Sequence, residues 1–196
     1  MKRAKRNRVV ISAVALAVIA TATAACTNSP ASSNTAGKGG NMGGSSQTSA
    51  SRVASLLQAG IAQSNQQDWS AATATFQEAL AIDPNDLYAN YDLGVAAQGS
   101  GNSSGAISYY NKALAINANY TPAVYNEAIL LETSQPSQAV AMYQKIVSLN
   151  PRASTAYLRM AFVQAEQGDL TDAKANDAKA VSLNPSFAQY QLPAKQ

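Results

Sequence analysis

One spacing recurs along this chain. The alanines Ala72, Ala106, Ala139 and Ala173 are separated by 34, 33 and 34 residues. Each alanine begins a run with helical periodicity. The residue four positions after the alanine is large or polar, and the residues seven and eight positions after it are apolar. A fixed period of this length predicts a repeat architecture, whose units bury their apolar faces by stacking on their neighbours.

The runs also share their endings. Three of them have a proline twelve residues after the alanine, and the other has Asn117-Ala118-Asn119, whose asparagines favour a turn. Upstream of each run lies a second helical signal, clearest in Tyr91-Asp92-Leu93-Gly94. The pattern resembles the tetratricopeptide repeat (TPR), a helix–turn–helix unit of about 34 residues. The resemblance implies an all-α fold, an α-solenoid of about four repeats at 53–86, 87–120, 121–153 and 154–187.

The resemblance also assigns core positions. With Val53 as position 1, small residues such as Gly60 are expected at positions 8, 20 and 27, where two helices cross closely. Position 24 is expected in the core, and it is Tyr110 and Tyr143 in the second and third repeats. In the fourth repeat it is Asp177, which predicts either a weakened last interface or a solvated end of the array.

The third repeat is one residue shorter than the others. The missing residue is expected in the turn at 133–137, where Pro136 suits the first position of a helix. In the second repeat, the turn at 99–102 contains two glycines and an asparagine.

Residues 1–25 have the organisation of a signal peptide. A basic segment at 2–8 precedes a mostly apolar run at 9–20 and small residues at 21–25. The run is shorter than the roughly 20 apolar residues that a membrane-spanning helix needs.

The single cysteine directly follows this leader. Thr23-Ala24-Ala25-Cys26 resembles a bacterial lipobox, which implies cleavage before Cys26 and a diacylglyceryl lipid on its thiol. Two acyl chains suffice for stable anchoring. Ordinary cleavage after Ala24, with release of the protein, or an uncleaved signal anchor are the alternatives.

Two segments flank the repeats at 53–187. Residues 26–52, the lipidated cysteine and a Ser-, Gly- and Asn-rich stretch, have little to bury and are expected to form a flexible linker. Such a linker of about 25 residues spans roughly 25–30 Å. Residues 188–196 are expected as a C-terminal tail or lid, in which Tyr190 and Leu192 fold back with Phe187, unless the last helix pairs with another subunit.

Charge and composition exclude several functions. The formal charge of +3 depends on five basic residues in the first eight, and from Cys26 onward nine Lys and Arg face 11 Asp and Glu. Without the leader, no basic stripe remains for nucleic acid. Histidine is absent, which excludes His-based triads and His metal sites. Asp68, Asp169 and Asp172 lie where aspartate caps helices, so we expect no enzyme, no metal and no cofactor besides the lipid.

The resemblance further implies a concave groove lined by the first helix of each repeat. Positions 5 and 9 form two mainly apolar rows beside a polar row at position 6, which suits an amphipathic helix or an extended peptide. The alternative is that these side chains pack between neighbouring helices. Two of the five carboxylate-clamp positions of some TPR proteins are matched, by Asn126 and Arg159, so a clamp is not expected. The candidate groove residues are Leu57, Ile61, Tyr91, Val95, Tyr125, Asn126, Ile129, Leu158, Arg159 and Phe162.

The expected function is a membrane-anchored adaptor or scaffold of the bacterial cell envelope. It would lie on the extracytoplasmic side and bind a protein or peptide partner. The alternative is a self-associating spacer lipoprotein, a homo-oligomer.

Overall fold

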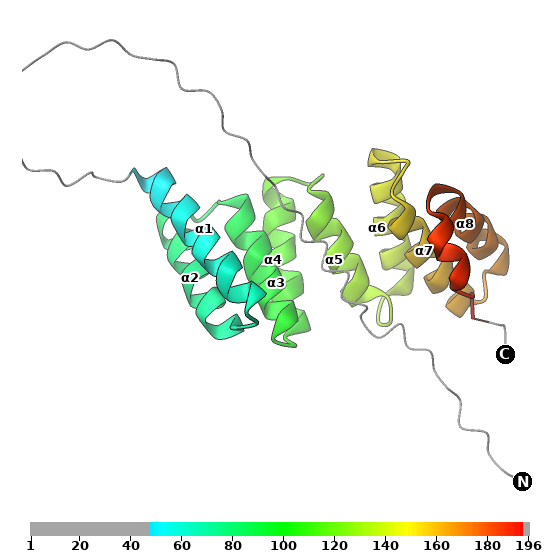
Figure 1. Ribbon diagram of the computed structural model, residues 1–196, viewed down its shortest axis with the longest axis horizontal. Helices are drawn as coiled ribbons and strands as arrows, with labels where there is room; N and C mark the ends of the chain where they lie inside the picture. The colour runs from blue at the N-terminus through cyan, green and yellow to red at the C-terminus, as the bar shows by residue number, and fades with distance from the viewer. Residues whose placement is uncertain (1–47, 194–196) are drawn as a thin grey trace, which may run out of the picture. The chain divides into compact units, whose positions relative to one another are not determined.

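The computed structural model of the chain describes residues 48–193. Within this range the chain forms eight α-helices and one 3-10 helix, with no strand, which confirms the all-α prediction. The helices pack in consecutive pairs, and each pair packs on the next (Figure 1). Their bounds are α1 Ser49–Asn65, α2 Trp69–Ile82, α3 Leu87–Gly99, α4 Ser103–Ile116, α5 Thr121–Leu131, α6 Pro136–Leu149, α7 Ser154–Gln167, α8 Leu170–Leu183 and η1 Pro185–Gln189.

Short polar side chains fix where several helices begin. Asp68 and Asp169, expected as caps, accept hydrogen bonds from the backbone N–H groups of Ala71 and Asp172. Asp86 caps α3 in the same way, through the N–H of Ala89 at 2.7 Å. These side chains satisfy N–H groups that have no partner inside the helix.

The core lies where the two helices of a repeat cross. Tyr110 and Tyr143 are fully buried, as predicted. A Cβ placed on Gly94 would lie 2.4 Å from Cε1 of Tyr110, and a Cβ on Gly60 would lie 2.4 Å from Cε1 of Phe76. Only a residue without a side chain lets the two helices come this close, which explains the glycines at position 8 of the first two repeats.

The turns inside the repeats differ in one detail. Gly101 and Gly168 have left-handed backbones, with φ of 84° and 87°, and the equivalent residue of the first repeat is Gln67, with φ of 61°. In the shorter third repeat the turn has no such residue, and α6 begins at Pro136, as predicted.

The array begins earlier than the sequence indicated. The hydroxyl of Thr48 accepts a hydrogen bond from the N–H of Ser51, and α1 starts at Ser49. Residues 49–52, assigned to the linker from their composition, are therefore helical. The signal peptide, Cys26 and the linker up to residue 47 lie outside the described residues.

At the other end, η1 packs on α8. The rings of Phe187 and Tyr190 lie 6.1 Å apart, while Tyr190 stays 37% exposed. Asp177 is half-buried, with a buried Oδ1 that accepts no hydrogen bond, so its position is neither an apolar core position nor a solvated one. None of the helices in residues 48–193 has the length and apolarity to cross a membrane.

Candidate functional site

The apolar candidate residues lie one helical turn apart on the first helices of the repeats, at positions 5 and 9. At position 5, Leu57, Tyr91 and Tyr125 pack against the core clusters, and Leu158 is buried. The structure therefore uses the position 5 row largely for internal packing.

Position 9 is more open. Ile61 is 43% exposed. Ile129 and Phe162 are half-buried and belong to none of the core clusters of the described residues, whereas Val95 packs on the cluster around Tyr110. This row is the better candidate for contact with a partner.

The two polar candidates are engaged within the array. Nδ2 of Asn126 donates hydrogen bonds to the hydroxyls of Tyr91, at 3.2 Å, and Tyr110, at 3.4 Å. The Tyr110 hydroxyl in turn donates to Oε1 of Gln98 at 2.7 Å. The network joins the second repeat to the third. Burial, and then the nearby Asp92, raise the pKa of Tyr91 to about 12.

Arg159 makes the same connection one repeat later. Its Nη2 lies 2.6 Å from Oε2 of Glu132, and its Nε donates to Oε1 of Glu132 at 2.7 Å and to the hydroxyl of Tyr143 at 3.0 Å. Because Arg159 is paired with Glu132, its charge is already neutralised within the array.

The junction of the first two repeats lacks this arrangement. Phe76 stands where the second and third repeats have tyrosine, so no hydroxyl is present. Oγ of Ser64, at the position of Gln98 and Glu132, is buried without a partner. Asp92, at the position of Asn126 and Arg159, has no hydrogen-bond partner among the described residues. Burial, and then repulsion by Asp86, raise the pKa of Asp92 to about 7.

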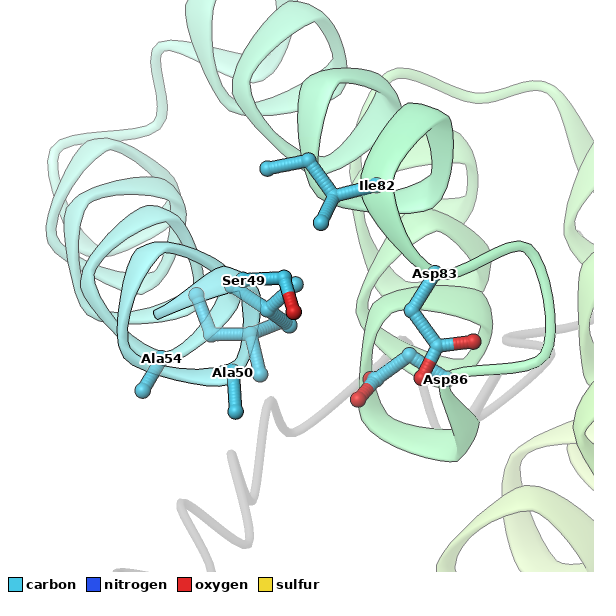
Figure 2. A pocket seen from close by; sticks show the side chains of 8 residues that line it. Ser49, Ala50, Ala54, Ile82, Asp83 and Asp86 are labelled. Carbon is cyan, nitrogen blue, oxygen red and sulfur yellow. The ribbon is translucent and has the colours of Figure 1, made fainter. Parts of the chain in front are cut away.

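A pocket of about 330 Å³ lies beside this junction, between the start of α1 and the α2–α3 turn (Figure 2). Of the residues that line it, only Leu57 is a groove candidate predicted from the sequence. Its apolar lining comes from Ala50, Val53, Ala54, Leu57 and Ile82, and its polar lining comes from Ser49, Asp83 and Asp86.

The equivalent space one repeat later is occupied by tyrosines. Tyr88, Tyr91 and Tyr120 stand at the positions of Ala54, Leu57 and Asp86. The Tyr120 ring lies edge-on to the other two, with centroids 6.1 Å from Tyr88 and 5.2 Å from Tyr91. The pocket therefore exists because the first repeat has smaller or charged residues at three positions. Aligning the repeats at these positions would have revealed it.

Two family models, both described as tetratricopeptide repeat, match residues 64–126 and 129–186. Together they cover most of the helical array. The chain belongs to the tetratricopeptide repeat family. TPR domains are in general interaction modules and not enzymes, and within residues 48–193 no cluster of His, Cys, Asp and Glu suited to a metal ion is present.

Solved TPR structures share the fold. MamA from Desulfovibrio magneticus RS-1 is 23% identical, with a TM-score of 0.63 over 68% of this chain and 76% of that chain. PilF of Pseudomonas aeruginosa is 23% identical, with a TM-score of 0.64 over 71% and 66%. YrrB, described as a TPR protein with an unusual peptide-binding site, is 19% identical, with a TM-score of 0.62 over 71% and 73%. No curated protein matches the chain significantly.

Proposed function

We propose that this TPR protein is a lipid-anchored adaptor on the extracytoplasmic side of a bacterial membrane, without catalytic activity. It binds a peptide segment of a partner protein along the first helices of its repeats. The observation that carries the proposal is the position 9 row, in which Ile61, Ile129 and Phe162 lie outside the core clusters and keep part of their apolar surface accessible.

Rows of apolar side chains at a fixed spacing suit a peptide, because an extended or helical segment can place anchors along them. Aromatic anchors such as Phe162 contribute large contact area at a small entropic cost. The fold likeness to YrrB, described with a peptide-binding site, agrees with this use of the array.

The anchoring part of the proposal rests on the sequence. The leader at 1–25 ends at Ala24-Ala25-Cys26, and the only thiol of the chain stands where a lipobox has its lipidated cysteine. Expression in a bacterium with labelled fatty acid tests this directly. The label should appear on the full chain and be lost in Cys26→Ser, together with membrane association. An unlabelled, soluble wild-type protein would remove the anchor from the proposal.

Partner capture tests the groove. The full chain with a C-terminal affinity tag, solubilised from the envelope in mild detergent, is compared with Ile61→Ser/Ile129→Ser/Phe162→Ser. The matched control is Ile116→Ser/Leu149→Ser, because these residues are as exposed as Ile61, at 42% and 46%, but lie at the ends of α4 and α6. A partner retained by the control and lost by the folded triple variant supports the groove. Equal retention by both would place binding elsewhere.

Self-association is the second candidate, and the open first repeat favours it. Leu56 and Ile82 line a second pocket, of about 380 Å³, on α1 and α2, and no earlier repeat is present in the described residues to cover it. Sedimentation of the full chain across a hundredfold concentration range tests this candidate. A mass that stays that of one chain would exclude a homo-oligomeric spacer.

A further inference from the structure

We infer that the pocket between α1 and the α2–α3 turn holds a basic side chain, lysine or arginine, of a partner's peptide segment. This inference names the ligand chemistry of a pocket that shares Leu57 with the candidate groove residues, and it therefore rests on the proposed function. The inference goes beyond the proposed function because it assigns a binding site to the first repeat and a positive charge to the ligand.

The pocket combines an apolar wall with an acidic rim. Val53, Leu57 and Ile82 supply the apolar lining, and Asp83 and Asp86 supply the carboxylates. Figure 2 shows the two carboxyl groups together on the side opposite Ser49 and Ala50. A lysine or arginine side chain has the matching construction, because its aliphatic stem packs on apolar surface while the charged end stays at the polar edge.

Both carboxylates retain capacity to bind. Oδ1 of Asp83 accepts from the N–H of Asn85 at 3.1 Å, and Oδ1 of Asp86 accepts from the N–H of Ala89. The second oxygen of each has no hydrogen-bond partner among the described residues. Within residues 48–193, the single ion pair is that of Arg159 with Glu132, so no internal cation neutralises this rim.

The charge around the pocket favours a cationic occupant. Residues 48–120 contain five acidic residues and two basic ones, Arg52 and Lys112, whereas residues 121–193 contain six acidic and five basic ones. Asp92 lies further along α3 and is destabilised as an anion by burial and, to a smaller extent, by Asp86. A cation at the rim relieves this repulsion, and like-charged peptides are disfavoured there.

Another junction of the array contains a cation paired with an acidic side chain. At the junction of the third and fourth repeats, the guanidinium of Arg159 fills the space beside Glu132 and Tyr143. At the first junction the chain supplies no cation, because position 6 is Asp92. A basic side chain in the pocket would face Asp83 and Asp86, because Asp92 does not line it.

The later repeats indicate substitutions that remove the negative charge of the pocket rim without changing the turn. Asp83 ends α2, and the three later repeats have Asn117, Asn150 and Asn184 at this position, each accepting the same local N–H bond. Asp83→Asn therefore reproduces a turn that the protein already contains. Asp86→Asn keeps a side chain that caps helices as well as aspartate does.

The test uses the full chain in mild detergent and pools of nine-residue peptides. The central residue is fixed as lysine, arginine, norleucine or glutamate, and the other positions are random mixtures of Leu, Ala and Ser. Affinities are measured by fluorescence polarisation for the wild type, Asp83→Asn/Asp86→Asn and the control Asp68→Asn/Asp169→Asn. The control makes the same charge change at two helix caps outside the pocket.

The lysine and arginine pools should bind the wild type and the control about tenfold more tightly than the norleucine pool. In Asp83→Asn/Asp86→Asn this ratio should fall to about one. Ala54→Tyr, which copies Tyr88 of the next repeat and fills the pocket, should weaken all the pools. An equal preference in the two double variants, or no preference in the wild type, overturns the inference.

Other occupants give distinct outcomes. Dimerisation of the wild type that disappears in Asp83→Asn/Asp86→Asn would assign the pocket to a second copy and overturn the inference. Failure of all pools to bind a chain with an unchanged thermal melt would overturn it as well. The proposed function is judged separately, by partner capture with the Ile61→Ser/Ile129→Ser/Phe162→Ser variant, which leaves Asp83 and Asp86 intact.

Discussion

Nη2 of Arg159 lies 2.6 Å from Oε2 of Glu132, and this pair joins α7 to the end of α5. Both side chains are less than one-quarter exposed, so the charges are largely withdrawn from water. The same glutamate accepts a hydrogen bond from Tyr143 at 2.6 Å. The interface of the third and fourth repeats therefore depends on a small polar network at the edge of the core.

Removing one partner of this network should be costly. In Arg159→Leu, Glu132 stays partly buried without a counter-charge, and we expect the free energy of unfolding to fall by about 2–3 kcal/mol. Arg159→Leu/Glu132→Leu should recover part of this loss, because no unpaired charge remains. Urea denaturation measures both, with the exposed Arg152→Leu as a control. Equal losses in the single and double variants would contradict the prediction.

Asp92 should make stability depend on pH. Its pKa rises from 3.8 to about 7 in the fold, so the native state holds the proton more tightly than the unfolded state. The contribution of Asp92 to stability should therefore be most favourable below about pH 4 and fall as the pH rises, until the penalty is complete above about pH 7. Asp92→Asn should remove this loss, which is at most about 4 kcal/mol for a pKa raised from 3.8 to about 7. Thermal melts from pH 4 to 8 measure it, and parallel curves for wild type and variant would contradict it.

Gly94 should not tolerate a methyl group. Alanine favours a helix over glycine by about 1 kcal/mol. In Gly94→Ala, however, the new Cβ would lie 2.4 Å from Cε1 of Tyr110, and overpacking of this kind costs about 1–3 kcal/mol. The difference between these two effects is a net loss of about 1 kcal/mol, which urea denaturation measures. Ser108→Ala, on the exposed face of α4, should change little. A Gly94→Ala variant as stable as wild type would refute close crossing of α3 and α4.

The turn between α1 and α2 should be improved by glycine. Gln67 has φ of 61°, in the left-handed region, where the second and fourth repeats have Gly101 and Gly168. Side chains raise the energy of this conformation by about 1–2 kcal/mol. Gln67→Gly should therefore raise the melting temperature, and Gly101→Ala should lower it. Calorimetry of both variants checks the pair, and a destabilised Gln67→Gly would show that its side chain has another role.

Much of the fold follows from local sequence signals. The helices α3, α5 and α7 begin at the predicted repeat boundaries, and Pro136 begins α6, because capping and turn chemistry act over a few residues. The burial of Tyr110 and Tyr143 was also predictable, since small residues at fixed offsets leave room for one large side chain per repeat.

The exposure and the bonding partners of individual groove residues were not predictable from local signals. Leu158 is 9% exposed and Ile61 is 43% exposed, although both belong to the apolar rows. The difference arises because a side chain is covered by neighbouring helices, and α1 has a following repeat but no preceding one in the described residues. The partner of Arg159 depends in the same way on the neighbouring repeat. The sequence pattern of a single repeat therefore predicts neither the exposure of these side chains nor the partner of Arg159.

The uneven charge of the array also affects how a ligand approaches. Acidic residues outnumber basic ones five to two in residues 48–120 and are nearly balanced by them in residues 121–193, so the electrostatic potential is more negative around the first half. A cationic segment is therefore attracted to α1–α4 while it is still separated from them by water. Salt shortens the range of this attraction, to about 10 Å at 0.1 M. Added salt should consequently slow association far more than it speeds dissociation.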